Sequence, residues 1–264
     1  MKAFDFFYDN KNLSDFGFVI CRFGDNGLDT VTNGSKISFN TVSTLGGTKH
    51  ELLSTAYEDC LEATIQICKN SCNNNNAEIS STELRELTRW LCRKKFLKFK
   101  ILDEDYIDLY FEAAFNISRI EMEGKLYGLE LEVKTNRPFA LKEPVTIKVN
   151  NKVENGKHSI NDASQDEGYI YPYTEITINK KGNLKIHNAI ENRDTYIANC
   201  VVGEVITMDY PVIRSSISSH DIQNDFNWNF FRVANTFENS RNDLTVSIPC
   251  SIKIEYSPVV KVGL

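Results

Sequence analysis

The sequence lacks the long apolar segments and short catalytic motifs that mark several large protein classes. No apolar run approaches the ~18 residues that a membrane-spanning helix needs, and residues 1–5 contain no apolar core of a secretory signal. No Gly-Lys-Ser/Thr follows a glycine-rich stretch, and no Gly-x-Ser-x-Gly turn occurs. We therefore expect no membrane insertion, no nucleoside-triphosphatase site and no serine-hydrolase site.

Cysteine is infrequent, and its spacing fits no framework. The chain has 7 cysteines, an odd number, for which reduced thiols in a protein made in the cytosol are the simplest account. Cys60, Cys68 and Cys72 lie close together in the sequence, and His50 is the nearest histidine. Their spacing matches no zinc-binding pattern. We therefore predict no metal and no cofactor.

Basic residues are too few for a typical nucleic-acid-binding face. The formal net charge of the chain is −6, whereas binders of double-stranded nucleic acid normally carry a basic surface. The one basic cluster, Arg93–Lys95 with Lys98 and Lys100, lies at the end of a predicted helix. Cations there complement the helix dipole, so we expect no sequence-specific binding of nucleic acid.

The most informative segment present is Ser80–Ala140, because it contains the single strong helix pattern. We predict a helix over Glu83–Arg93, begun by a capping box of Ser80 and Glu83, with Ser81 as an alternative N-cap. Its apolar face, spaced for a helix, consists of the predicted structural anchors Leu84, Leu87, Trp90 and Leu91.

Most of the remaining chain alternates apolar and polar residues, as β-strands do. Strands are predicted over 61–67, 96–101, 110–120, 129–133 and 145–149. Ile176–Ile178 and Leu184–Ile186 flank a glycine-containing turn, which favours a hairpin. The clearest alternation runs from Leu244 to Tyr256, where Pro249 requires an edge position or a bend. The polar stretch Asn150–Glu167 is expected to be a long loop.

Two prolines place a domain boundary in the middle of the chain. Pro138 and Pro144 bracket Lys142, and the 264 residues provide enough chain for two cores. We predict domains 1–141 and 142–264. The first is a β-sandwich with one helix. The second has no good helix candidate, and its many short strands favour another β-sandwich. The fold class is therefore mainly β.

Taken in order, these segments resemble the distal tail protein (Dit) family of long-tailed, non-contractile bacteriophages. The motifs of the first half are Ile37-Ser38-Phe39-Asn40, Tyr57-Glu58-Asp59 with the following strand, Glu83-Leu84-Arg85 with Trp90-Leu91, and Tyr127–Leu131 leading to Arg137-Pro138-Phe139-Ala140. Those of the second half are Gly182–Asn188, Asn199 with Gly203-Glu204, Asp225-Phe226-Asn227 and Ile252–Pro258. The resemblance rests on the order and spacing of these motifs across nearly the whole chain.

The resemblance implies both a fold and a role. The first domain would carry an extended hairpin and assemble into a homo-hexameric ring, and the second would be a galectin-like β-sandwich outside the ring. The ring would join the tail tube to the tip or baseplate proteins. Its partners would be the tail-tube protein and the tail-associated (Tal) protein, with the tape-measure protein as a further candidate. The protein would be a non-enzymatic component of the virion tail tip, synthesised in the host cytoplasm.

Within this reading, we place the extended hairpin at Thr32–His50. Its candidate ring and tube contacts are Asn33, Ile37, Phe39, Asn40 and Leu45. Exposed strand edges favour pairing with another chain, and a head-to-tail interface whose rotation closes gives a ring. Because DNA must pass through the lumen without being held, we also expect acidic or neutral residues there.

The alternative function is a module that binds host cell-wall carbohydrate through the second β-sandwich. His187, Asn188, Arg193 and Trp228 supply the residue types of galectin sugar sites, but their spacing does not reproduce the galectin arrangement. We predict instead that His187 and Asn188 end a strand, and that Trp228 belongs to the core with its aromatic neighbours Phe226, Phe230 and Phe231.

A third class, hydrolases, has weaker support. The acidic runs Asp103–Asp105 and Glu121/Glu123 lie in predicted turns, where solvated carboxylates are ordinary, whereas a glycosidase needs two across a cleft. Ser218–Asp221 places serine, histidine and aspartate side by side, but a triad is a spatial arrangement drawn from separate elements.

Overall fold

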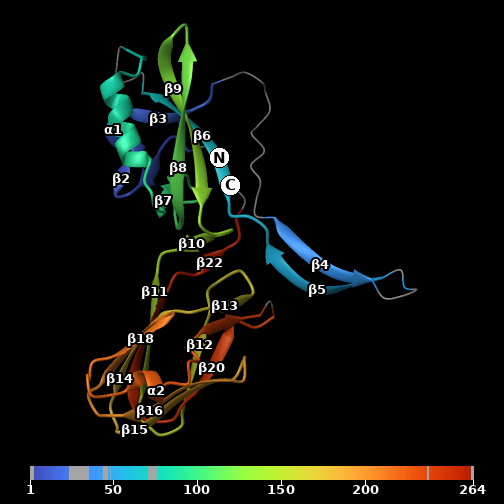
Figure 1. Ribbon diagram of the computed structural model, residues 1–264, viewed down its shortest axis with the longest axis vertical. Helices are drawn as coiled ribbons and strands as arrows, with labels where there is room; N and C mark the ends of the chain where they lie inside the picture. Colours follow the sequence, from blue (N-terminus) through green and yellow to red (C-terminus); the bar gives the residue numbers. More distant parts are fainter. Residues whose placement is uncertain are drawn as a thin grey trace. The chain divides into compact units, whose positions relative to one another are not determined.

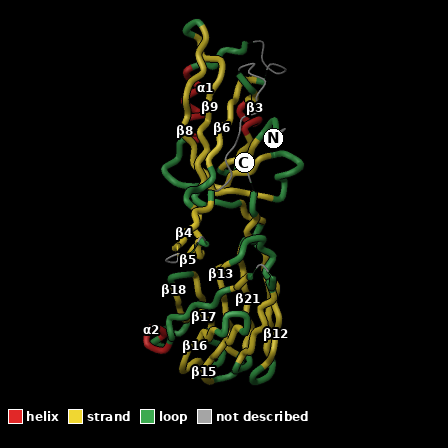
Figure 2. Tube along the Cα trace, turned by 90° about the vertical axis from the view of Figure 1, so that its right-hand side faces the viewer, coloured by secondary structure: helices red, strands yellow, loops and turns green. Residues whose placement is uncertain are grey.

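The computed structural model of the protein describes residues 3–23, 36–43, 47, 49–70, 76–236 and 238–262. The chain divides into two compact units, shown in Figure 1: unit one is Met1–Leu141 with Lys261–Leu264, and unit two is Lys142–Val260. Strands dominate both units, which confirms the predicted mainly β class, and Figure 2 shows how little of the described chain is helical. Among the described residues, no helix is both long and apolar enough to cross a membrane.

Unit one is built on one large antiparallel sheet. Its strands follow the order β2-β1-β7-β8-β9-β6-β3. Their bounds are β1 (Phe6–Tyr8), β2 (Lys11–Asn12), β3 (Phe18–Cys21), β6 (Glu62–Lys69), β7 (Leu97–Ile101), β8 (Leu109–Met122) and β9 (Lys125–Thr135). A short 3-10 helix, η1 (Leu13–Phe16), precedes β3. β8 and β9 form the longest hairpin, turned at Glu123 and Gly124, both of which have positive φ. Two short strands, β10 (Ala140–Lys142) and β22 (Val259–Val260), lie in the chain where the units begin and end.

The helix α1 (Ser81–Leu91) covers the apolar face of this sheet. Ser80 accepts a hydrogen bond from the Glu83 N–H at 3.3 Å, and the Glu83 carboxylate accepts one from the Ser80 N–H at 2.7 Å. This confirms the predicted capping box. The helix begins and ends two residues earlier than predicted, because the cap sits at Ser80 and the backbone leaves helical geometry at Cys92. The alternative cap, Ser81, is the first helical residue.

Unit two contains two facing sheets around one core. The first has the order β11-β21-β14-β17-β18 and the second β12-β20-β15-β16. Their strands are β11 (Val145–Asn151), β12 (Gly156–Asn161), β14 (Tyr173–Ile178), β15 (Gly182–Asn188), β16 (Arg193–Cys200), β17 (Val205–Asp209), β18 (Val212–Ser215), β20 (Arg241–Val246) and β21 (Cys250–Tyr256). A further pair, β13 (Gly168–Ile170) and β19 (Val233–Asn235), and the short helix α2 (Ile222–Asp225) complete the unit.

Two predicted connections in unit two proved to join different sheets. The segments around Ile176 and Leu184 do not form the predicted hairpin, because β14 pairs with β17 and β21 whereas β15 pairs with β16 and β20. The alternation from Leu244 to Tyr256 likewise divides into β20 and β21, in separate sheets. The chain therefore bends at Pro249, where it crosses from one sheet to the other. The two crossings contact each other, since the Asn179 N–H donates to the Pro249 carbonyl at 3.0 Å.

Two shorter elements were missed by the sequence prediction. The stretch Asn150–Glu167, expected to be a loop, contains β12, an edge strand with only Gly156 and Ile160 buried. An edge strand needs few apolar residues, so its pattern is weak. Unit two was expected to contain no helix, but it contains α2, whose four residues are too few for a periodic pattern.

Candidate functional site

The first candidate surface is the β4–β5 hairpin, formed by β4 (Ile37–Ser43) and β5 (His50–Tyr57) (Figure 1). The two strands pair antiparallel from Ile37 with Tyr57 to Ser43 with His50, and a bulge falls at Leu53. Within the described part of the chain they pair with no third strand. A two-stranded hairpin alone is at best marginally stable in water, so this one needs a further surface.

The hairpin has one apolar and one polar face. Residues opposite each other across the strands share a face, and side chains alternate along each strand. The apolar face consists of Ile37, Phe39, Leu52 and Tyr57 with small polar neighbours, and the other face of Ser38, Asn40, Val42, Glu51, Ser54 and Ala56. Phe39 is 64% exposed and Leu52 57% exposed. Apart from Tyr57, which is half-buried and contacts the Phe139 ring with centroids 6.4 Å apart, the apolar face is uncovered in the single chain.

The structure places only some of the predicted interface residues. Ile37, Phe39 and Asn40 lie on β4, the first two on the apolar face, whereas Asn33 and Leu45 lie outside the described residues. The Asn40 carboxamide is on the polar face and donates to Ser54 Oγ at 3.0 Å. The predicted hairpin ended at His50, where the second strand begins; the bulge at Leu53 interrupts the alternation that would have marked β5.

The predicted anchors of α1 lie against the sheet. Leu87 and Leu91 are fully buried, Trp90 is 4% exposed and Leu84 is half-buried. The Trp90 indole N–H donates to the Tyr8 carbonyl at 2.9 Å. At the helix end, the Arg93 guanidinium donates to the Trp90 carbonyl and pairs with Asp9 at 2.9 Å. Arg93 of the predicted basic cluster is therefore at the helix end, whereas Lys98 and Lys100 lie on β7.

The opposite face of the sheet in unit one is polar and mostly acidic. Along β6, β8 and β9 it presents the polar face residues Glu62, Gln66, Glu112, Asn116, Glu130, Glu132 and Lys134. Glu62 pairs with Lys134 at 2.7 Å, and Glu130 accepts from the Gln66 carboxamide at 3.0 Å. Along these three strands the carboxylates outnumber the cations, whereas β7 (Leu97–Ile101) adds Lys98, opposite Glu112, and Lys100 to the same face.

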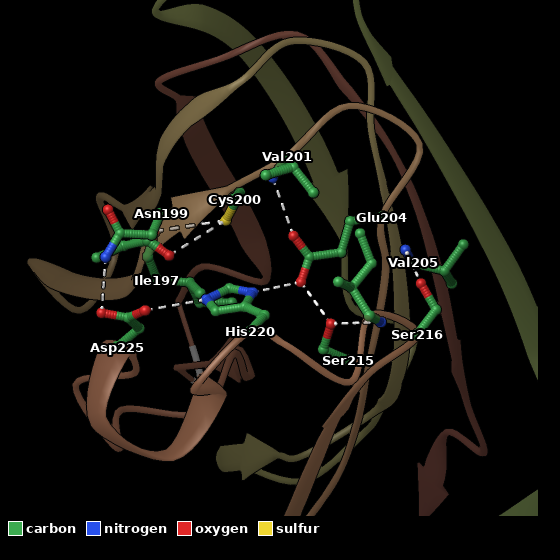
Figure 3. A network of polar contacts seen from close by, with 12 residues as sticks. Ile197, Asn199, Cys200, Val201, Glu204, Val205, Ser215, Ser216, His220 and Asp225 are labelled. Carbon is green, nitrogen blue, oxygen red and sulfur yellow. Dashed lines mark hydrogen bonds and ion pairs between the residues drawn. The ribbon is translucent and has the colours of Figure 1, made fainter.

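A buried polar network joins separate segments of unit two, as Figure 3 shows. Glu204, whose side chain is fully buried, lies between β16 and β17. Its Oε1 is 2.5 Å from His220 Nδ1 and accepts a hydrogen bond from Ser215 Oγ at 2.6 Å. Its Oε2 accepts one from the Val201 N–H at 3.0 Å. One carboxylate thus holds a turn, the end of β18 and the segment before α2.

A second carboxylate completes the network on the other side of the imidazole. Asp225 Oδ2 is 3.2 Å from His220 Nε2, and Asp225 Oδ1 accepts from the Asn199 carboxamide at 3.0 Å. Burial alone would raise the pKa of Glu204, but hydrogen bonds from Ser215 and His220 outweigh it and lower that pKa. The network therefore stabilises ionised Glu204 inside the protein.

This network does not have the geometry of a catalytic triad. The Ser215 hydroxyl donates to Glu204, and the two imidazole nitrogens face Glu204 and Asp225. A serine nucleophile needs the imidazole as its base, and here the carboxylate takes that position. The sequence run Ser218–Asp221 contributes only His220 to the network. We assign the Glu204–His220–Asp225 network a structural role. The spacing of residues in the sequence could not reveal this network because its members come from distant segments.

Of the residue types of a galectin sugar site, Asn188 and Arg193 are opposite each other on β15 and β16, next to His187, but their bonds lie within the protein. His187 Nδ1 bonds to Asp194 at 2.7 Å, and Asn188, at the end of β15, is buried and donates to Asn242 at 2.8 Å. The core prediction for Trp228 is wrong: its side chain is 57% exposed, while those of Phe226, Phe230 and Phe231 are buried as predicted. A φ of +58° at Trp228 turns its side chain out of the alternation.

The thiols and acidic groups form no recognisable site in the described residues. Cys21, Cys60, Cys68, Cys92, Cys200 and Cys250 are free, and Cys72 lies outside the described range. Among described residues, no group of three or more His, Cys, Asp or Glu side chains could hold a metal ion. Burial raises the pKa of the Cys200 thiol to about 11 and that of Cys250 to about 12, which makes both poor nucleophiles.

Comparison with known proteins agrees with this architecture. A family model described as "Phage tail protein N-terminal domain" matches residues 1–137, and one described as "Phage tail C-terminal domain" matches residues 139–256. The two-domain β fold and these matches define a phage tail protein. The chain belongs to the phage tail protein family that the two models describe. Among curated proteins, no sequence matches it.

A solved structure of the same fold spans nearly the whole chain. The crystal structure of Dit from phage SPP1, described as a paradigm of the hub adsorption apparatus in phages that infect Gram-positive bacteria, superimposes with a TM-score of 0.65. The alignment covers 97% of this chain and 99% of that one at 12% sequence identity. The likeness confirms the fold expected from the motifs.

Proposed function

We propose that this protein is the hub of a phage tail, a non-enzymatic ring of six copies that joins the tail tube to the tip proteins. The observation that carries the proposal is the uncovered apolar face of the β4–β5 hairpin, with Phe39 and Leu52 both more than half exposed. A face of this kind in a tail component fits a neighbouring chain better than solvent. The Dit-like fold supports the same role.

In this proposal unit one forms the ring, with each hairpin laid on the next copy or on the tail tube. A head-to-tail contact of this kind gives a closed ring when the rotation between neighbouring copies is a whole fraction of a full turn. Ile37 and Phe39 would contribute apolar contacts, and Asn40 would lie on the solvent side of the hairpin. Asn33 and Leu45 remain candidate contacts. The tail-tube and tail-associated (Tal) proteins would meet opposite sides of the ring, and the tape-measure protein would lie in its lumen.

The polar face of the sheet is our candidate for the lumen surface. Along β6 and β9, Glu62, Glu130 and Glu132 outnumber Lys134, and this excess of negative charge would repel the phosphate backbone of passing DNA. Lys134 is already paired with Glu62. A ring whose lumen is lined by unpaired basic residues would contradict this assignment.

The test compares two charge insertions on opposite faces of β4. Phe39→Glu places a carboxylate on the apolar face, and Val42→Glu places one on the polar face, where the native side chain is 45% exposed. We expect Phe39→Glu to abolish rings and tail assembly while leaving a folded chain, and Val42→Glu to assemble normally. Sedimentation velocity and complementation of a hub-deficient phage measure the two effects. Equal assembly by both variants would exclude the hairpin as the interface.

A further inference from the structure

A continuous strip of aromatic rings connects three loops of unit two. The aromatic strip consists of Tyr169, Tyr171, Tyr210, Phe230 and Trp228. Tyr171 stacks on Tyr210 with ring centroids 4.2 Å apart and an interplanar angle of 10°. Tyr169 contacts Tyr171 at 5.5 Å, and Phe230 lies 5.4 Å from Tyr210 and 6.4 Å from Trp228. Residues from β13, the β17–β18 turn and the segment after α2 thus form one surface.

Three rings of the strip are exposed, and the half-buried Tyr171 and the buried Phe230 connect them to the core. Tyr169 and Tyr210 are each 55% exposed and Trp228 is 57% exposed, whereas Phe230 is only 4% exposed. Phe226, also buried, supports Trp228 with a centroid separation of 5.8 Å. Rings held in this way lose little freedom when a ligand covers them, which favours binding.

The backbone holds Trp228 outward in a strained conformation. Its φ of +58° is unfavourable for a bulky side chain. Asn227 fixes this turn: its Oδ1 accepts from the N–H groups of Tyr196 and Asn229 at 3.2 and 3.1 Å, and its Nδ2 donates to the Asp194 carbonyl at 3.0 Å. The chain thus maintains local strain to present an apolar ring to solvent, and such strain clusters at functional sites.

The charges beside the strip favour a neutral ligand. The Arg232 guanidinium lies 3.8 Å from the centroid of the Tyr169 ring, and both of its ends are bonded to Glu191, at 2.5 and 2.9 Å. The Glu191 carboxylate therefore offsets its positive charge, which weakens its attraction for an anion. Asp209, exposed beside Tyr210, would repel a phosphate-bearing polymer.

The size of the strip favours a small ligand over a folded protein. A buried Tyr or Trp contributes ~150–250 Å², so three half-exposed rings offer on the order of 300 Å², against roughly 800 Å² per partner in a standard protein interface. A ring face carries negative quadrupole charge, which suits the polarised C–H groups of a sugar. Tyrosine hydroxyls at the ring edges supply both donors and acceptors for sugar hydroxyls.

From these observations we propose that the aromatic strip binds a short neutral oligosaccharide, with Tyr169, Tyr210 and Trp228 packing against sugar faces. The activity goes beyond the hub role and does not depend on ring formation. It also uses a different set of residues from His187, Asn188 and Arg193.

The experiment uses the full-length protein and defined probes: tetramers of β-1,4-linked N-acetylglucosamine, glucose and galactose. The chain has 2 tryptophans, and Trp90 is buried, so a saturable change in fluorescence on titration reports Trp228. Calorimetric titration then compares variants. We expect Trp228→Ala and Tyr210→Ala each to weaken binding at least about tenfold, as loss of an aromatic anchor does. Phe4→Ala, which removes a 75% exposed ring from unit one, should bind normally.

Three results would overturn the proposal. None of the three tetramers binds; a tetramer binds but with equal affinity to the strip variants; or the strip variants instead lose self-association or capture of a tail protein. The last outcome would identify the strip as a protein interface. Circular dichroism of each variant confirms that the fold is retained, which is expected because the removed side chains are mainly exposed.

Discussion

Trp90 stacks on Phe16, with ring centroids 4.5 Å apart and an interplanar angle of 22°. The same indole also lies 5.8 Å from Phe6 and donates its N–H to the Tyr8 carbonyl. One side chain therefore fastens α1 to η1 and to β1, two elements from the beginning of the chain. Together with the buried Leu87 and Leu91, it holds the helix on the sheet.

Truncating Trp90 should destabilise unit one. Trp90→Ala is expected to cost about 3–5 kcal/mol, the usual cost of removing a large buried aromatic. Trp90→Phe keeps most of the stacking and loses the indole hydrogen bond, so about 1–3 kcal/mol is expected. Urea unfolding followed by near-ultraviolet circular dichroism measures both. A negligible loss in Trp90→Ala would show that α1 is held by other contacts.

Removing His220 should destabilise unit two. His220→Ala leaves the carboxylates of Glu204 and Asp225 facing each other without the imidazole between them. The change removes a packed ring and leaves the buried Glu204 carboxylate without one of its hydrogen-bond partners, which should cost at least about 3 kcal/mol. Ser215→Ala, which removes a single hydrogen bond to the same carboxylate, is the matched control and should cost about 1–3 kcal/mol. Equal losses of unfolding free energy in the two variants would show that the imidazole contributes no more than a single hydrogen bond does.

The lowered pKa of Glu204 predicts how stability changes with acidity. Burial opposes this shift, and the hydrogen bonds from Ser215 and His220 produce it. A carboxylate with a depressed folded-state pKa contributes stability above its unfolded pKa, near 4.5, and loses it as pH falls through the lower, folded value. The free energy of unfolding of unit two should therefore decrease below about pH 4.5. Glu204→Gln should be less stable at neutral pH and show a shallower acid slope; an unchanged slope would contradict the assignment.

The positive φ of Trp228 predicts an order of stability among its variants. A left-handed conformation costs a residue with a Cβ about 1–2 kcal/mol, and glycine adopts it freely. Trp228→Gly should thus be more stable than Trp228→Ala by about 1 kcal/mol. Thermal unfolding of the two purified variants measures the difference. A less stable glycine variant would indicate that the turn does not hold this conformation in solution.

The sequence predicted the elements better than it predicted their partners. The α1 helix was recognisable because its cap at Ser80 and the spacing of Leu87, Trp90 and Leu91 are local signals. The strands around Ile176 and Leu184 were recognisable for the same reason. Their membership of different sheets was not, because residues that face one core keep the same alternation whether the chain folds back or crosses over.

The candidate surfaces were predictable only in part. Ile37 and Phe39 were singled out from a motif, and the alternation of β4 places both on one face. Trp228 was predicted to belong to the core with its aromatic neighbours Phe226, Phe230 and Phe231. Composition carries no sign of the positive φ that is found at Trp228. The contact between Tyr171 and Tyr210 joins residues 39 positions apart, so no local pattern could predict the strip.

The most direct test of the hub account is the native mass of the unmodified full-length protein, measured with negative-stain images of the same sample. The account predicts a species six times the chain mass of 30.1 kDa, seen as a six-fold ring with a central pore. The account would be contradicted by a monomer at all concentrations in which the backbone amide hydrogens of the β4–β5 hairpin exchange freely with solvent.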